Sequence, residues 1–280
     1  MLDSNGYAIS AATKHIFDVD SLDADHFDLV AEVDGAERRE MMHILDHGIG
    51  AFTLDASHLL AQSDADAKVA LINFANCFGV VKGRGDGQSP VWRVQVREKA
   101  PALQSYSEMP GIAPFHTDAS YYPVPMKNLL FFVIKPAEIG GETQIFNLAS
   151  KLSEFATFPG GQDCIQLLKK PDFPFAMSAT FHKGDGPPPI EVAPVLAADH
   201  YVRFQIKALR EGFRRRPDLA SEEKVDAVER LNDFIQAHLT CEGVQLPRGH
   251  IVMLNNRRSL HSRKHFTDPQ RLLWRIGVMD

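Results

Sequence analysis

The sequence predicts a mainly β protein with flanking α-helices, in which an antiparallel core is closed or sandwiched. Helical patterns dominate about the first 80 residues and strand patterns dominate the rest, while one long amphipathic helix is inserted late, over about 221–239. This order lacks the regular alternation of strand and helix that builds a doubly wound sheet. Because no linker composition interrupts the 280 residues, we expect one domain over 1–280, with a helical N-terminal part over about 20–80.

The N-terminal part contains two predicted helices. The first spans 20–47, where apolar residues recur at helical spacing and Gly48 occupies a favoured position after the last turn. The second spans 63–78 and begins at Ser63, whose hydroxyl is suited to capping the first turn. Between the two helices, residues 49–54 predict a short strand.

Strand patterns follow from Val91 onward. Residues 91–96 alternate strictly between apolar and polar, and the apolar run 128–135 has the length of a buried strand. Gly140-Gly141 is a tight connection into the next strand. Further strands are predicted at 143–146, 202–206, 251–254 and 272–278. The proline-rich segment 184–189 cannot be a central strand or a helix interior, so it forms either a flexible lid or a surface loop.

Composition and charge narrow the class of protein. Apolar residues make up 44% and charged residues 24%, as is typical of a soluble globular chain. A net charge of −6 gives no basic surface for nucleic acid or an anionic membrane, and the basic run 214–216 is best explained as a solvated helix end. No apolar run approaches the roughly 18 residues that span a membrane. Three widely spaced cysteines and the absence of a signal-peptide pattern predict a cytoplasmic protein with reduced thiols.

The segment His116-Thr117-Asp118 is the first candidate site. In an extended chain, residues two apart project to the same face, so His116 and Asp118 can reach one metal while Thr117 points into the scaffold. A third ligand must come from elsewhere, and His261 follows the predicted strand 251–254. Two histidines and one carboxylate on one side of a metal form the facial triad of non-haem Fe(II) oxygenases. The competing histidines are His182, His250 and His265.

Arg275 is the second candidate. It lies in the apolar strand 272–278, where a buried charge is costly unless it is paired. Either an internal Asp or Glu or the carboxylate of a bound ligand would resolve that cost. Arg271, four residues earlier, shares the strand face of Arg275 by period-two counting.

Three ordered segments give the chain a specific likeness. They are Phe115 to Asp118, Gly140 to Thr143, and Asn256 to His261 continuing to Arg275, with Thr143 placed 27 residues after His116. In these segments, and over about residues 40–280, the chain resembles the Fe(II)/2-oxoglutarate-dependent oxygenases of the taurine dioxygenase and clavaminate synthase-like superfamily. The resemblance implies a double-stranded β-helix (jelly roll) core. It further implies that Fe(II), 2-oxoglutarate as cosubstrate and O2 take part in the reaction.

The resemblance also assigns roles to individual residues. His116, Asp118 and His261 match the iron ligands, which are the catalytic centre. Arg275 matches the arginine that pairs with the distal carboxylate of 2-oxoglutarate, and Thr143 matches a threonine that hydrogen-bonds the same molecule. Arg271 is either a further cosubstrate contact or a structural residue. The carboxylate of Asp118 argues against halogenation, because related halogenases carry a small residue at that position.

The expected reaction is hydroxylation of an unactivated C–H bond in a small polar molecule, with release of succinate and CO2. An amino acid or its derivative, free or carrier-bound, is the leading candidate, and the role would be biosynthetic. Possible substrate contacts are Tyr121, Tyr122, Arg93, Ser107, Glu108 and Arg258. We expect neither a nucleic-acid nor a membrane partner, and the sequence does not predict an oligomeric state.

Three alternatives stay open at this point. One is a catabolic oxygenase of a small sulfonate or other organic acid, which a pocket with one basic anchor and no partner for an amine would favour. Another is desaturation or cyclisation, since both begin from the same hydrogen abstraction. The third is a jelly-roll protein that merely binds a metal or a carboxylate ligand.

Overall fold

The strands form three antiparallel sheets. The computed structural model describes residues 35–81, 83, 89–97, 105–182, 184–197, 201–237 and 243–280. The major sheet has the order β1-β9-β5-β11-β2, with β3 also paired to β11, and the minor sheet has the order β4-β10-β6. The third sheet is the β7-β8 hairpin. The strands are β1 (Ala51–Asp55), β2 (Val80–Val81), β3 (Trp92–Gln95), β4 (Ala113–His116), β5 (Asn128–Lys135), β6 (Thr143–Phe146), β7 (Phe173–Ala176), β8 (Ile190–Ala193), β9 (His250–Asn255), β10 (Leu260–Arg263) and β11 (Leu272–Met279).

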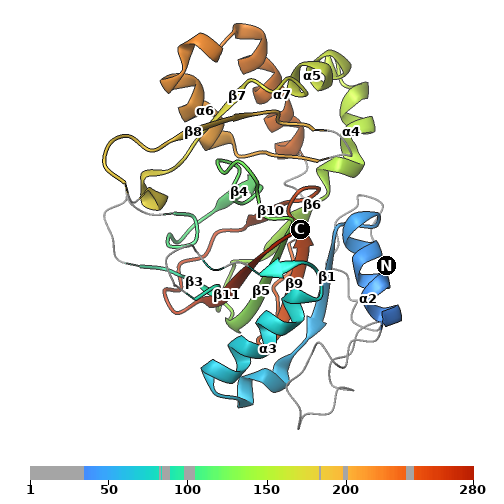
Figure 1. Ribbon diagram of the computed structural model, residues 1–280, viewed down its shortest axis with the longest axis vertical. Helices are drawn as coiled ribbons and strands as arrows, with labels where there is room; N and C mark the ends of the chain where they lie inside the picture. Colours follow the sequence, from blue (N-terminus) through green and yellow to red (C-terminus); the bar gives the residue numbers. More distant parts are fainter. Residues whose placement is uncertain are drawn as a thin grey trace.

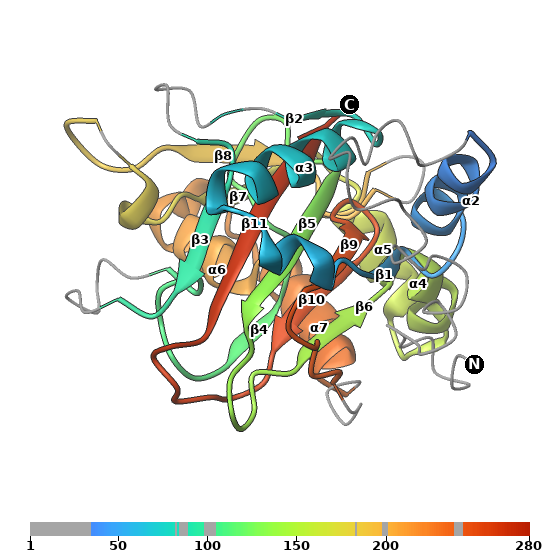
Figure 2. The ribbon, with the colours of Figure 1, turned by 90° about the horizontal axis from the view of Figure 1, so that it is seen from below.

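Helices cover the outer faces of the two larger sheets. Helices α2 and α3 pack against the major sheet, and α4 to α7 gather over the minor sheet (Figure 1). Seen from below, α3 lies across β11 and β5 (Figure 2). The helices are α2 (Gly35–Asp46), η3 (Ser57–Ala61), α3 (Asp64–Asn76), α4 (Leu148–Thr157), α5 (Gly161–Leu168), η5 (Ala179–Phe181), α6 (Ile206–Arg215), η7 (Pro217–Leu219) and α7 (Glu222–Ala237). None of these described helices has the length and apolar composition that crossing a bilayer requires.

Strand alternation divides the side chains between inner and outer layers. On β11, Trp274 and Ile276 face outward into the cluster under α3, while Leu273 faces inward and packs with Ile145 of the minor sheet. On the minor sheet, Phe146 and Leu260 face outward into the cluster under α4 to α7. Two facing antiparallel sheets around an apolar interior form the double-stranded β-helix that the resemblance implied.

Most predicted elements are confirmed within the described residues. The helix expected at 63–78 is α3, and the Oγ of Ser63 accepts a hydrogen bond from the Asp66 N–H at 3.2 Å. The helix expected at 221–239 is α7, with residues 238–239 outside the described range. Of the helix expected at 20–47, residues 20–34 lie outside the described part of the chain and α2 accounts for the rest. The basic run 214–216 ends α6 as expected, with Arg214 exposed, Arg216 half-buried and both ion-paired.

The strand predicted at 202–206 is wrong. Val202 makes only an isolated bridge to Leu196, and α6 begins at Ile206. The segment is extended, but its polar groups are used by the neighbouring loops. The N–H of Thr117 donates to the Phe204 carbonyl at 2.7 Å, and the guanidinium of Arg203 donates to the carbonyls of Ser120, Tyr122 and Pro123. These contacts replace the regular ladder that a strand needs.

Candidate metal centre

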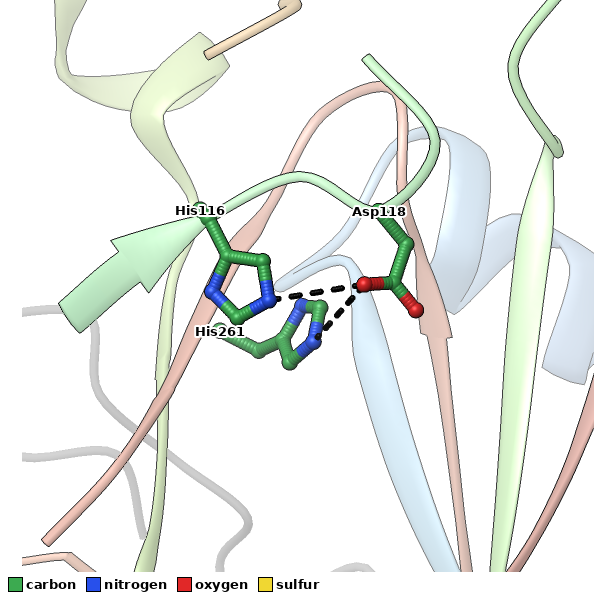
Figure 3. A group of neighbouring side chains, drawn as sticks. All are labelled: His116, Asp118 and His261. Carbon is green, nitrogen blue, oxygen red and sulfur yellow. Dashed lines mark ion pairs between the residues drawn. The ribbon is translucent and has the colours of Figure 1, made fainter. Parts of the chain in front are cut away.

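Three side chains converge where β4 and β10 meet. His116 ends β4, Asp118 follows it in a turn, and His261 lies on β10 directly opposite His116 in the register. The neighbouring Phe115 and Leu260 face outward, so alternation sends both imidazoles into the interior. Figure 3 shows both rings turned toward the carboxylate of Asp118. Thr117 is buried and bonded to Phe204, as expected for a residue pointing into the scaffold.

The ligand atoms are close enough to share one ion. Oδ1 of Asp118 lies 3.4 Å from Nε2 of His116 and 3.9 Å from Nε2 of His261 (Figure 3). The three donor atoms all lie within 4.8 Å of one another, and no other such group is found in the described residues. Adjacent ligands on an ion with bonds of about 2.1 Å stand roughly 3 Å apart. A small inward movement therefore suffices to close the triad on a metal.

The histidines are prepared to act as neutral ligands. Nδ1 of His116 lies 2.8 Å from the Pro114 carbonyl, so a proton on Nδ1 satisfies that oxygen and leaves Nε2 free to coordinate. Burial, followed by the nearby His116, lowers the pKa of His261 to about 3, which keeps this imidazole uncharged at neutral pH. Metal binding requires unprotonated imidazole, so both rings fit the role.

Asp118 uses its two oxygens differently. Oδ1 faces the imidazoles, whereas Oδ2 accepts a hydrogen bond from Arg275 Nη1 at 2.6 Å. Burial would raise the pKa of Asp118, but Arg275, a hydrogen bond with His116 and the two imidazoles together hold it well below its usual range. The carboxylate is therefore ionised and oriented to bind an ion through one oxygen. Arg275 therefore has an internal acid, Asp118, as a partner in this structure.

A cavity of about 740 Å³ opens beside the triad. His116, Asp118 and Arg275 line it, and the expected substrate contacts Tyr121, Tyr122 and Ser107 do as well. Its walls also carry the apolar or aromatic side chains of Trp92, Met109, Met126, Met177, Phe181 and Met279. The aromatic side chains of this wall contact one another. The Phe181 ring stacks on Tyr121 with centroids 5.7 Å apart and lies 6.1 Å from the Trp92 ring.

Arg271 and Thr143 lie away from that cavity. Arg271 directly precedes β11, four residues before Arg275, and its side chain reaches toward Gly141 near the start of β6. Its guanidinium is buried, and its only hydrogen bond to a described residue goes to the Gly141 carbonyl at 3.5 Å. Burial, with a smaller contribution from Arg263, lowers the pKa of Arg271 to about 9. Thr143 begins β6, two residues after Gly141.

Three expected substrate contacts are not part of the cavity wall. Arg93 is opposite Trp274 in the register, so alternation turns it to the outer face, where its Nε donates to Gln95 at 2.9 Å. Glu108 is buried, and its carboxylate faces Arg97 and Ser105. Arg258 lies in the turn between β9 and β10, away from the lining.

Sequence reasoning missed several lining residues, among them Trp92, Phe181 and Lys207. Trp92 was within reach, because the alternation that sends Arg93 outward sends its neighbour inward, and the Trp92 ring lies 5.3 Å from the Arg275 guanidinium. Phe181 and Lys207 come from segments that reach the cavity only through the tertiary fold. Lys207 is exposed, and its Nζ lies 4.7 Å from the Tyr106 ring. No local pattern marks either of these two residues.

Comparison with solved structures identifies the same architecture. An asparagine oxygenase solved with Fe(II), 3-hydroxyasparagine and succinate matches with a TM-score of 0.69 and 17% identity, covering 88% of this chain and 80% of that one. The non-heme iron oxygenase OrfP, solved with Fe and alpha-ketoglutaric acid, matches with a TM-score of 0.65 and 14% identity, covering 91% and 84%. At such identities these likenesses establish a shared fold.

The family follows from the sequence as a whole. No curated protein matches the chain. The family model described as "Taurine catabolism dioxygenase TauD, TfdA family" matches residues 13–276, which is nearly the full length. The matched region includes His116, Asp118 and His261, which the fold brings together as a possible iron site. The chain therefore belongs to the taurine catabolism dioxygenase TauD, TfdA family, and it is a 2-oxoglutarate-dependent dioxygenase that uses Fe(II).

Proposed function

We propose that the protein hydroxylates a C–H bond of a small anionic molecule bound in the cavity beside His116, Asp118 and His261. The observation that carries this proposal is a triad of metal-ligand type opening into a cavity of about 740 Å³. When bound there, Fe(II) and 2-oxoglutarate supply the oxidising power to insert one oxygen from O2, with release of succinate and CO2. The chain itself provides the ligands, the anchors and the enclosed wall.

Arg271 and Thr143 are proposed to hold the distal carboxylate of 2-oxoglutarate. Arg271 is a buried cation without a carboxylate partner among the described residues, and such a charge is costly to leave unpaired. Gly141 leaves room for it, because a Cβ there would approach Arg271 Nε to 3.1 Å. A cosubstrate held at the triad by its keto-acid end would have its other carboxylate pointing away from His116, Asp118 and His261. The residue that holds this distal carboxylate should therefore lie farther from the metal centre than Arg275, which touches the ligand Asp118.

Arg275 is proposed to hold the anionic group of the substrate. It lines the cavity and already contacts Asp118 at 2.6 Å. Once Asp118 binds a cation, its charge is shared, and Arg275 is available for a second anion. The family resemblance implies the cosubstrate role for Arg275 and leaves Arg271 as either a further cosubstrate contact or a structural residue. The positions of the two arginines, Arg275 on β11 and Arg271 just before it, favour dividing the roles in this way.

Amino acids are one class of candidate substrate. They are supported by the neighbours, because the asparagine oxygenase was solved with 3-hydroxyasparagine and OrfP with (3S)-hydroxy-L-Arg. Those ligands are known for the neighbours alone. A free or carrier-bound amino acid would place its carboxylate on Arg275. It would also require an acidic partner for its ammonium group.

A second candidate is an organic acid without a free amine. It is favoured because few acidic groups among the described residues line the cavity. Among its described lining residues, only Asp118 and Glu211 are acidic. Asp118 belongs to the metal centre, and Glu211 accepts two hydrogen bonds from Arg214 at 2.6 and 2.7 Å. Both carboxylates therefore already have a role, one at the metal centre and the other in an ion pair with the exposed Arg214. The apolar wall of Trp92 and Phe181 instead suits a hydrophobic body on the substrate.

Matched substrate pairs that differ only in the α-amine separate the two candidates. We expect 3-phenylpropanoate to stimulate succinate formation more than L-phenylalanine, and succinamate more than L-asparagine. Mass spectrometry should show a gain of one oxygen in the favoured member of each pair. The opposite preference would support the amino-acid candidate. If no acid or amino acid in a broad panel gains an oxygen while iron and 2-oxoglutarate are bound, the proposed hydroxylation is contradicted.

A further inference from the structure

A single buried side chain fixes the backbone of Asp118. Oδ1 of Asn256 accepts the Asp118 N–H at 2.7 Å, and Nδ2 of Asn256 donates to the Asp118 carbonyl at 3.1 Å. The same Nδ2 donates to the Met126 carbonyl at 3.0 Å. Asn256 is fully buried, so no water competes for these groups. Both backbone polar groups of a metal ligand therefore depend on one amide.

The two hydrogen bonds between the Asn256 side chain and the Asp118 backbone form a clamp. This clamp is needed because the regular strand pairing stops before Asp118. The last paired residue of β4 is His116, opposite His261, and Asp118 lies in the turn that follows. A side-chain amide offers the same donor and acceptor as a peptide unit. Asn256 thus takes the place that a neighbouring strand would fill. The next residue, Ala119, has φ 59 and is the only non-glycine with positive φ among the residues described, a conformation that persists only when surrounding contacts enforce it.

The position of Asn256 in the chain ties the ligands together. It lies in the turn between β9 and β10, five residues before His261. Its own N–H donates to the Lys127 carbonyl at 2.8 Å, which anchors the turn to the segment leading into β5. One turn therefore both leads into the strand that carries the ligand His261 and clamps the ligand Asp118. We therefore expect a substitution of Asn256 to alter the separation between Asp118 and His261.

We infer that Asn256 is a positioning residue of the metal centre, which sets the affinity for the ion by holding Asp118 in register with His116 and His261. This inference rests on the proposed metal centre. Partners that orient metal ligands typically influence metal affinity by roughly 10- to 100-fold. A residue with a purely structural role would instead change stability alone.

The neighbouring Asn255 provides a matched control. It is equally buried, and its Nδ2 donates to Asp46 Oδ1 at 2.9 Å while its Oδ1 accepts the Arg257 N–H at 2.9 Å. Its side chain makes no hydrogen bond to a metal ligand in the described structure. Asn255→Ala and Asn256→Ala therefore remove buried amides of the same size from adjacent positions, the end of β9 and the start of the turn after it, and only the second touches Asp118.

The test measures metal affinity and stability side by side. Asn256→Ala is expected to raise the Kd for Mn(II), and for Fe(II) under anaerobic conditions, by roughly 10- to 100-fold. Both variants should lower Tm by about the same amount, but Asn255→Ala should leave the Kd values for Mn(II) and Fe(II) unchanged. The anaerobic Fe(II)–2-oxoglutarate complex of Asn256→Ala should also show a shifted charge-transfer absorption. An unchanged metal Kd in folded Asn256→Ala would overturn the inference.

A second pair of variants covers the case in which Asn256→Ala does not fold. Asn256→Asp keeps the volume and the acceptor for the Asp118 N–H but loses both donated hydrogen bonds, and Asn255→Asp is its control. A weaker metal Kd in Asn256→Asp alone supports the inference, and equal Kd values in both variants reject it. If the wild-type protein itself binds neither ion, the proposed metal centre is what fails.

Discussion

Replacing His261 with alanine is expected to abolish tight Fe(II) binding and to lower kcat/KM by at least about a thousandfold, because metal-ion catalysis contributes several kcal/mol. The reason is geometric. His261 Nε2 lies 3.9 Å from Asp118 Oδ1 and supplies the third of three donor atoms within 4.8 Å of one another. Without it, two ligands on β4 and its following turn remain. Anaerobic Fe(II) titration and turnover with 2-oxoglutarate measure both effects.

His265 is the natural control for that variant. It lies four residues further on, is exposed and is outside the triad. His265→Ala should bind Fe(II) as the wild-type protein does. The assignment of the third ligand would be wrong if His261→Ala retained its iron while His265→Ala lost it.

Replacing Arg271 with alanine is expected to weaken 2-oxoglutarate binding by about 2 kcal/mol, or roughly thirtyfold in Kd, because a charge-assisted hydrogen bond is lost and the carboxylate is left unpaired. Arg271→Lys should restore the affinity only in part, since an ammonium group cannot form the bidentate contact. Thr143→Val should have a smaller effect of about 1 kcal/mol. Calorimetric titration of the Mn(II)-loaded protein gives these constants without turnover.

Arg275→Ala is the matched comparison for the cosubstrate anchor. It is expected to raise the KM for the organic substrate far more than the Kd for 2-oxoglutarate. The reverse result, with 2-oxoglutarate binding lost in Arg275→Ala and kept in Arg271→Ala, would return the cosubstrate role to Arg275. Both variants should be compared after metal loading, because Arg275 also contacts Asp118.

Local sequence patterns were sufficient to predict most strands, because side chains along a strand alternate between the inner and outer faces of its sheet. The strand around Trp274 alternates, and its outward residues meet α3 while its inward residues meet the opposite sheet. The same rule failed at 202–206, where the extended chain has strand composition but its polar groups bond to Thr117 instead of a regular ladder. Composition gives no indication of which partner an extended segment finds.

The candidate site shows the same division. The three metal-ligand candidates could be predicted because residue type and spacing can be read from the sequence. The structure brings His116, Asp118 and His261 together. The contact between Arg275 and Asp118 could not be predicted, since it joins residues far apart in the sequence. Asn256 carries no local signal either, because its clamp on Asp118 joins residues 138 positions apart.

The most direct test of the central claim is succinate formation from 2-oxoglutarate by protein reconstituted anaerobically with Fe(II) and then exposed to air. We expect Fe(II)-dependent succinate and CO2 release by the wild-type protein, increased by a substrate of the matched panel and absent in His261→Ala. Wild-type protein that binds Fe(II) and 2-oxoglutarate but forms no succinate with any member of the panel would contradict it. So would equal succinate formation by His261→Ala.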